Sequence, residues 1–213
     1  MSNNLLPISK SGIKYMLYSF AIFTALSVFH FYTLALVAFT FIVFFAYIYR
    51  NPEREQNVFE QNSVLSPVDG FIISIEEIKD ANYVYKVEVD NTYLDVAILR
   101  TPFDSVLSGV TVQHGARLSL GNSLGKKINE NVELVFTNGE YQTMKIKHTL
   151  KQSVVPFSVY AKEGQKLRQA FRYGDMPNGI TEMYIPRNFR LNMNVGDRLT
   201  ASQTLIGYFI SVP

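Results

Sequence analysis

Few side chains in this sequence have both the type and the spacing that a catalytic or metal site needs. The chain of 213 residues contains no cysteine, so it offers neither a thiolate nucleophile nor a disulfide framework. His114 and His148 lie far apart and lack the spacing of metal ligands. We therefore expect both to be ordinary surface or core histidines, and we predict no metal site.

Two short stretches combine an acid or an amide with glycine. Asp69 precedes Gly70 and is expected to be a turn residue, although an acid here is also a candidate for general acid or base chemistry. Asn178 and Gly179 follow Pro177, and this combination predicts a tight turn. An Asn-Gly bond can break slowly through a succinimide, but that reaction produces no ketone that could serve as an electrophilic cofactor.

Short β-strands are the elements expected to position these residues. Runs rich in β-branched and aromatic residues alternate with Gly, Asn and Asp turns, and Asn138-Gly139 is typical of a type I′ hairpin turn. The predicted strands are 71–75, 83–89, 93–99, 132–136, 141–147, 154–160, 182–185 and 204–210. Residues 66–70 and 195–207 resemble the two halves of a barrel-sandwich hybrid. The pattern predicts an all-β barrel or sandwich.

An apolar segment precedes this β-rich part. Residues 15–49 contain no Asp, Glu, Lys or Arg. One helix of that length would measure about 52 Å, whereas the hydrocarbon core of a bilayer is about 30 Å thick. Two helices over about residues 14–29 and 32–49, turning near His30, fit a membrane better. We therefore predict a transmembrane helical hairpin.

Basic residues flank the apolar segment on both sides, with Lys10 and Lys14 before it and Arg50 and Arg54 after it. The positive-inside rule then places both ends, and the domain that follows, on the cytoplasmic face of the cell membrane. A re-entrant hairpin, or one long tilted span with the domain outside, is the alternative. The expected organisation is a hairpin over residues 1–50, a connector over 51–63 and a β domain over 64–213.

The part of the chain after the hairpin is nearly neutral. The whole chain has 20 basic and 18 acidic residues, and residues 1–50 hold three bases and no acid, which leaves 17 bases and 18 acids, a net charge of −1. That balance argues against a nucleic-acid partner. Basic groups at 126–127 and 162–168 are equally compatible with contact with anionic lipid headgroups and with a solvated face.

Several motifs, taken in their order along the chain, resemble the phosphatidylserine decarboxylase family in its short, membrane-hairpin form. The resemblance covers about residues 50–210. The motifs are YRNPER at 49–54, SPVDG at 66–70, TPFD at 101–104, NEN at 129–131, the stretch 165–186 and the closing strand at 196–207. This resemblance implies a role in phospholipid metabolism, with a membrane phospholipid such as phosphatidylserine as partner.

Members of that family cleave themselves at a Gly-Ser bond. The serine hydroxyl attacks the preceding carbonyl to give an ester, and β-elimination then leaves a pyruvoyl group that serves as the electron sink for decarboxylation. An aspartate and a histidine move protons. On this sequence the aspartate falls on Asp69, the histidine on Val106, and the Gly-Ser pair on Asn178 and Gly179.

The resemblance therefore implies a site that has lost its nucleophile. Glycine has neither a hydroxyl nor a β-carbon, so Gly179 can form neither the ester nor the pyruvoyl group, and the chain contains no Gly-Ser dipeptide elsewhere. We expect no cofactor and a non-catalytic homologue. The alternatives are an active decarboxylase with another nucleophile, such as Thr181, and a barrel-sandwich adaptor of a membrane complex. A homo-oligomer or a pairing with a paralogue remains open.

Overall fold

The computed structural model describes residues 6–55, 62–121, 123–139 and 142–210. The chain divides into two compact units, Met1–Glu53 and Arg54–Pro213. Residues 56–61 of the predicted connector lie outside the described residues, as do Glu140, which follows the predicted Asn-Gly turn, and Tyr141, the first residue of the predicted strand 141–147. Each unit is described by itself.

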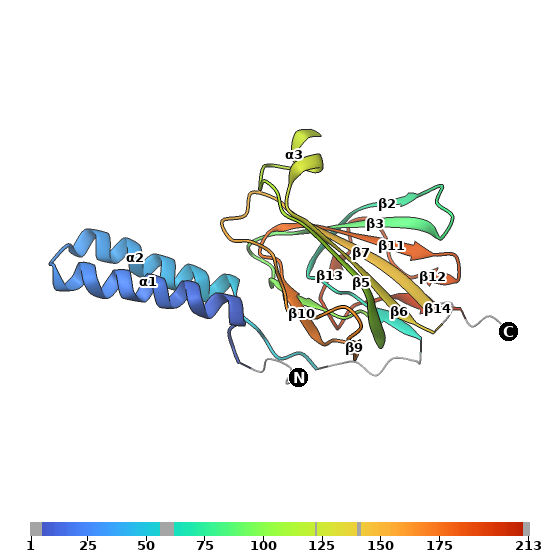
Figure 1. The fold of residues 1–213 in the computed structure, drawn as a ribbon, viewed down its shortest axis with the longest axis horizontal. Helices are drawn as coiled ribbons and strands as arrows, with labels where there is room; N and C mark the ends of the chain where they lie inside the picture. The colour runs from blue at the N-terminus through green and yellow to red at the C-terminus, as the bar shows by residue number, and fades with distance from the viewer. Residues whose placement is uncertain (1–5, 56–61, 122, 140–141, 211–213) are drawn as a thin grey trace. The chain divides into compact units, whose positions relative to one another are not determined.

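The first unit is a pair of antiparallel helices, α1 (Lys10–Val28) and α2 (Tyr32–Ile48) (Figure 1). The helices turn at His30, whose φ is 61°, as the sequence predicts. Gly12 lets them approach closely, because a Cβ there would lie 2.3 Å from Cβ of Tyr49. By length and composition α1 is able to cross a membrane, whereas α2 is a shorter apolar helix of 17 residues.

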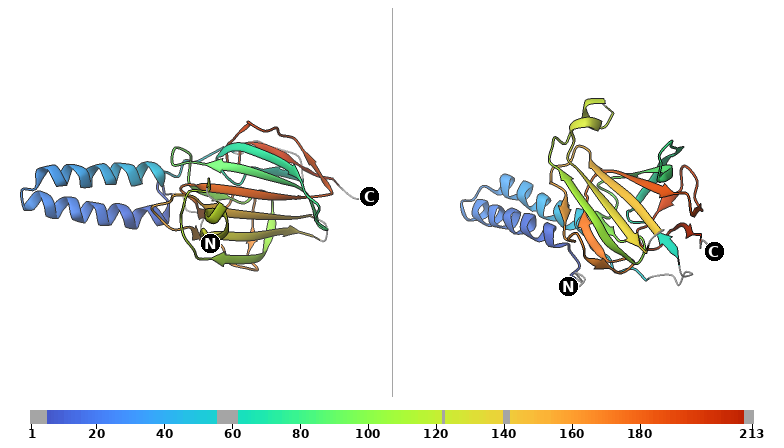
Figure 2. Two further views of the ribbon diagram at one scale, coloured as in Figure 1. Left: turned by 90° about the horizontal axis from the view of Figure 1, so that it is seen from above. Right: turned by 45° about the vertical axis from the view of Figure 1, so that its right-hand side comes forward.

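The second unit is built from antiparallel β-sheets, which confirms the predicted β-rich domain (Figure 2). Its main sheet has eight strands in the order β13-β2-β3-β11-β7-β6-β5-β9, and two further sheets have the orders β1-β14-β12 and β4-β10-β8. The strands are β1 (Ser63–Leu65), β2 (Gly70–Glu77), β3 (Tyr83–Asn91), β4 (Ile98–Arg100), β5 (Ser105–Gln113), β6 (Asn131–Asn138), β7 (Gln142–Leu150), β8 (Ser158–Val159), β9 (Lys166–Leu167), β10 (Arg172–Asp175), β11 (Gly179–Pro186), β12 (Phe189–Leu191), β13 (Arg198–Leu199) and β14 (Leu205–Phe209). A short helix, α3 (Ser123–Ile128), precedes β6.

Two predicted strands are largely wrong. Residues 93–97 of the predicted strand 93–99 are not part of a strand, because the Asp95 carboxylate accepts hydrogen bonds from N and Oγ1 of Thr92 and closes a turn. Of the predicted strand 154–160, only Ser158–Val159 pairs. The strand β5 was missed, since serine, glycine and threonine interrupt its apolar residues.

Strand β11 lies in the middle of the main sheet, between β3 and β7. Its residues alternate, so that Gly179 and Thr181 face the buried core while Ile180 and Glu182 lie on the other, partly exposed face. The start of β11 pairs with the end of β3 and the end of β7, and the start of β2 pairs with the end of β3. We call this end of the sheet the site end, because it carries Gly179.

Candidate functional site

The pair Asn178-Gly179 is held firmly at the site end. Gly179 is the register partner of Asn91 on β3 and of Leu150 on β7. The Asn178 amide Nδ2 donates to the Lys151 carbonyl at 2.7 Å, and the Lys151 N–H donates to the Asn178 carbonyl at 3.1 Å. The carbonyl that the family's chemistry would attack is therefore fixed in a hydrogen bond to the chain that follows β7.

Gly179 is needed for close packing and not for a turn. Its φ is not in the left-handed region, and the bend that was predicted around it is confined to Pro177 and Asn178. A Cβ on Gly179 would lie 2.5 Å from the Thr149 carbonyl oxygen and 2.6 Å from Sδ of Met176. A serine does not fit here unless these neighbours move.

Asp69 lies near this position but is engaged in an ion pair. Its two carboxylate oxygens accept hydrogen bonds of 2.6 Å from the two terminal guanidinium nitrogens of Arg54. Oδ1 also accepts a hydrogen bond of 2.8 Å from the Ala201 N–H. Asn91 Nδ2 donates to the Asp69 backbone carbonyl at 2.8 Å, and Asn91 is in turn the register partner of Gly179. The structure thus brings Asp69 and Gly179 together through Asn91, but the Asp69 carboxylate is already paired with the Arg54 guanidinium.

Val106 lies at the other end of the sheet. It pairs with Thr137, which pairs with Thr143, and by register this row is level with Pro186 at the end of β11. Gly179 and Pro186 are the first and last residues of β11, so about 24 Å of strand separates the two rows. The structure does not bring Val106 to Gly179.

A buried polar network beside Gly179 was missed in the sequence. His148 on β7 is the register partner of Thr181 on β11, and its Nδ1 shares a hydrogen bond of 2.8 Å with the Thr181 hydroxyl. Its Nε2 shares one of 2.7 Å with the Tyr173 hydroxyl. The signal was the alternation along β7, because Met144 and Ile146 face the core and His148 follows in the same phase.

Burial keeps this histidine neutral. His148 is fully buried and its ring stacks on Phe157 at 5.7 Å. Removal from water lowers the pKa of His148 from 6.5 to about 3, and the same burial raises the pKa of Tyr173 well above its usual value. A neutral imidazole between two hydroxyls satisfies both in the core, and it also places a base against the Thr181 hydroxyl.

This depressed pKa predicts a loss of stability in mild acid. The unfolded chain binds a proton at His148 below about pH 6.5 while the folded chain does not, so stability rises with pH between about 3 and 6.5. The free energy of unfolding is expected to fall by about 2 kcal/mol between pH 6.5 and pH 5. Chemical unfolding of the full chain in detergent, followed across this range, measures it.

The matched variants separate His148 from other acid-sensitive groups. His148→Gln is expected to lower stability at neutral pH and to remove this component of the pH dependence. His114→Gln changes an exposed histidine and should leave the wild-type slope in place. Equal slopes for the wild type and His148→Gln would contradict the assignment.

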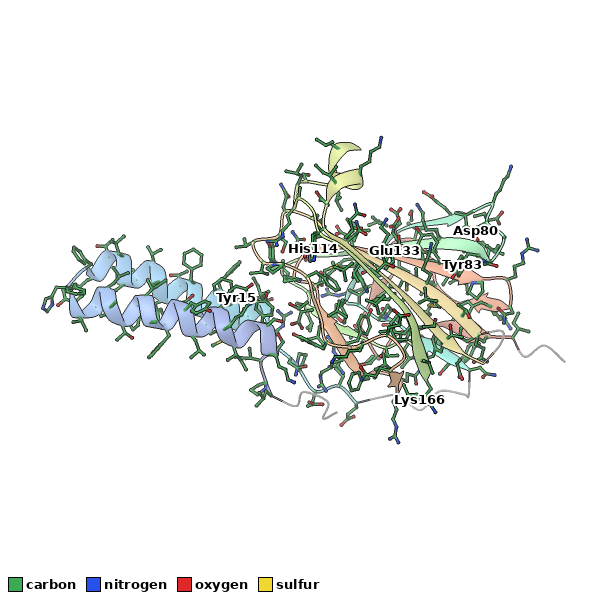
Figure 3. All side chains as sticks on the ribbon, in the orientation of Figure 1. Tyr15, Asp80, Tyr83, His114, Glu133 and Lys166 are labelled. Atoms are coloured by element: carbon green, nitrogen blue, oxygen red, sulfur yellow. The ribbon has the colours of Figure 1, made fainter. Side chains whose placement is uncertain are left out.

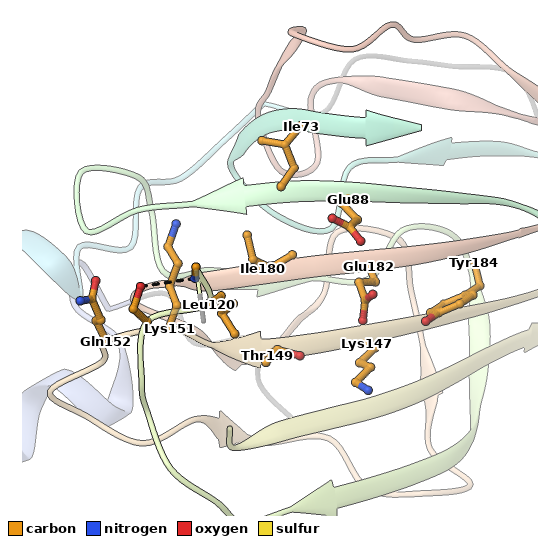
Figure 4. A pocket seen from close by; sticks show the side chains of 12 residues that line it. Ile73, Glu88, Leu120, Lys147, Thr149, Lys151, Gln152, Ile180, Glu182 and Tyr184 are labelled. Carbon is orange, nitrogen blue, oxygen red and sulfur yellow. Dashed lines mark hydrogen bonds between the residues drawn. The ribbon is translucent and has the colours of Figure 1, made fainter. Parts of the chain in front are cut away.

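The opposite face of the same strands carries a cavity of about 540 Å³ (Figure 4). This volume is within the range of small-ligand sites. Its charged lining consists of Glu88, Lys147, Lys151 and Glu182, and burial raises the pKa of the Glu182 carboxyl. Two acids and two bases in one cavity suit a ligand that itself carries charges of both signs.

The fold and the site together define a class of protein. An apolar helical pair precedes an antiparallel β domain, whose candidate site lies at one end of a central strand. The family model for phosphatidylserine decarboxylase matches residues 41–207, and the chain belongs to this family.

The curated relatives agree with this assignment. A phosphatidylserine decarboxylase proenzyme of Geotalea uraniireducens (strain Rf4) is 26% identical over 214 residues, which cover 97% of this chain and 99% of the relative. Proenzymes of the same name from Burkholderia mallei (strain SAVP1) and Burkholderia lata are 25% and 27% identical over 169 residues, 78% of each chain. No solved structure matches the chain.

Proposed function

We propose that this chain is a non-catalytic member of the phosphatidylserine decarboxylase family that binds phospholipid at the cytoplasmic face of the cell membrane. The observation that carries this proposal is Gly179. The position that corresponds to the processed serine lacks a hydroxyl, and a Cβ there would lie 2.5 Å from a backbone carbonyl oxygen. The surroundings are thus adapted to glycine.

The residues at this position do not fit a pyruvoyl group. A pyruvoyl carbon skeleton includes the former β-carbon, which has no space beside Thr149 and Met176. Asp69, at the family's aspartate position, forms an ion pair with the Arg54 guanidinium. Val106, at the family's histidine position, is level with the far end of β11. Three separate features therefore support the loss of self-processing.

The cavity of Figure 4 supports headgroup binding in this proposal. The phosphatidylserine headgroup carries an ammonium, a carboxylate and a phosphate. Glu88 and Glu182 can pair with an ammonium, although Glu88 already pairs with Lys86 at 2.8 Å. Lys147 and Lys151, which pair with Glu133 and Asp90 respectively, can share their charge with the anionic groups. In this proposal the chain recognises the headgroup without converting it.

One observation favours a second candidate, an active decarboxylase that uses Thr181. The Thr181 hydroxyl lies 2.8 Å from Nδ1 of His148, the arrangement of a nucleophile and its base. Attack on the Ile180 carbonyl, elimination and hydrolysis would leave a 2-ketobutyryl end and release ammonia. Against this candidate, Thr181 lies inside β11 and is paired with Val89 and His148 in regular register.

The test is to purify the full chain and determine whether it is cleaved and whether it releases CO₂ from phosphatidylserine vesicles. Our proposal expects an uncleaved chain and no CO₂ above background. Cleavage between Ile180 and Thr181, abolished by Thr181→Val, would establish the second candidate in its place.

A further inference from the structure

The site end of the β domain exposes several large apolar side chains. Leu94 and Val154 are 72% and 67% exposed, the highest values among the described large apolar residues of the β domain. Leu118, Leu124 and Ile128, on the excursion between β5 and β6, are 42%, 50% and 39% exposed. Large exposed apolar patches mark surfaces that meet a protein or a membrane.

Hydrogen bonds tie the three loops that carry these side chains into one surface. The Tyr93 hydroxyl donates to the Gln152 carbonyl at 2.9 Å and accepts the Val154 N–H at 3.0 Å. The Gln152 N–H in turn donates to the Leu118 carbonyl at 3.4 Å. We call Leu94, Leu118, Leu124, Ile128 and Val154 the apolar rim.

The rim is bound to the site end itself. Asn129 Nδ2 donates to the carbonyls of both Leu118 and Leu150, each at 2.8 Å, and Leu150 is the register partner of Gly179. Leu120 of the same excursion lines the cavity described above. A membrane or protein that contacts the apolar rim would therefore lie next to the candidate headgroup cavity.

The charge of this end complements an anionic surface. Four of its acids, Asp69, Asp90, Asp95 and Glu130, each form an ion pair, with Arg54, Lys151, Arg198 and Arg117 respectively. The helix α3 adds Lys127, whose side chain is exposed, as is that of Leu124 in the same helix. Leucines flanked by lysines are the pattern of a protein segment that enters the interface of an anionic bilayer.

We propose that the apolar rim is a second membrane contact, through which the site end of the β domain enters the headgroup layer of an anionic phospholipid bilayer. The inference rests on the proposed function in taking phospholipid as the partner. The occupant is a bilayer because the same chain carries a membrane-length apolar helix, α1. The contact would present the cavity directly to headgroups.

Depth-dependent quenching tests this contact on the full chain. Because the sequence has no cysteine, single probes can be attached through Leu94→Cys, Leu124→Cys and Val154→Cys without a competing thiol. Ala81→Cys is the matched control, an exposed position beside Asp80 in the β2–β3 turn; Figure 3 shows Asp80 and Tyr83 at one end of the sheet and His114 near the other. The chain is reconstituted in phosphatidylcholine vesicles containing anionic lipid and nitroxide-labelled phospholipid.

We expect quenching several-fold greater at the three rim probes than at Ala81→Cys. Lys127→Gln should weaken quenching of the Leu124→Cys probe in vesicles with anionic lipid, since one lysine changes partition about fivefold. Quenching at the rim no greater than at Ala81→Cys would overturn the proposal. Evidence that a bound protein covers the rim and keeps it from lipid would also overturn it. Quenching reports depth and not cleavage, so its failure would leave the result on self-processing unaffected.

Discussion

Gly179→Ser is expected to lower the free energy of unfolding by about 3 kcal/mol, the upper end of the usual cost of overpacking a core. The new Cβ would meet a backbone carbonyl at 2.5 Å and Met176 Sδ at 2.6 Å, and the backbone cannot move without disturbing β7. The variant is also expected to remain uncleaved, because the His148 imidazole is bonded to Thr181 and not to residue 179. Denaturant unfolding and mass spectrometry measure the two effects.

Gly109→Ser is the matched control. It introduces the same side chain into the same sheet, where a Cβ would only touch Val135 at 3.6 Å. Its effect should be within about 0.5 kcal/mol. Met176→Ala in the Gly179→Ser background should recover part of the lost stability by removing one of the two close contacts. A stable Gly179→Ser protein that cleaves itself would show that the site accepts serine and that only the hydroxyl was lost.

Arg54→Ala is expected to lower the free energy of unfolding by about 3 kcal/mol or more, because it leaves the Asp69 carboxylate buried without its cation. The two side chains are 9% and 12% exposed and meet through two hydrogen bonds of 2.6 Å. Asp69→Asn should cost a similar amount, and the double variant should cost less than the sum of the single changes.

Arg198→Ala provides the comparison for this ion pair. Arg198 contacts the Asp95 carboxylate at 3.6 Å, but its side chain is 67% exposed, so its removal should cost less than about 1 kcal/mol. If Arg54→Ala were no more damaging than Arg198→Ala, Asp69 would not be held by the arginine. It would then be free to act as the acid or base that the family uses at this position.

Much of the fold could be predicted from local pattern. The absence of charge over residues 15–49 predicted the helical pair, and Asn138-Gly139 predicted the β6–β7 hairpin, in which Gly139 has a φ of +70°. The strand prediction was wrong where a side chain forms hydrogen bonds with the backbone in place of a neighbouring strand, as the Asp95 carboxylate does by closing a turn. Alternation with small polar residues also hid β5, because its strand character comes from pairing with β6 and not from its own composition.

The site was predicted less completely, since it depends on residues brought together by pairing. Sequence order places Asp69 and Gly179 far apart, and only the register through Asn91 brings them together. The turn chemistry of Pro-Asn-Gly gave a plausible but incomplete reason for Gly179, whose close contacts with Thr149 and Met176 are visible only in three dimensions. The partnership of His148 with Thr181 required the register of β7 against β11.

Intact-mass analysis of the purified full chain is the most direct test of the central claim, that this member of the family does not process itself. The experiment uses freshly purified protein and a second sample treated with a carbonyl-reactive amine. We predict one species at 24.3 kDa with no mass added by the amine. Two fragments, the C-terminal one blocked and reactive toward the amine, would contradict the account.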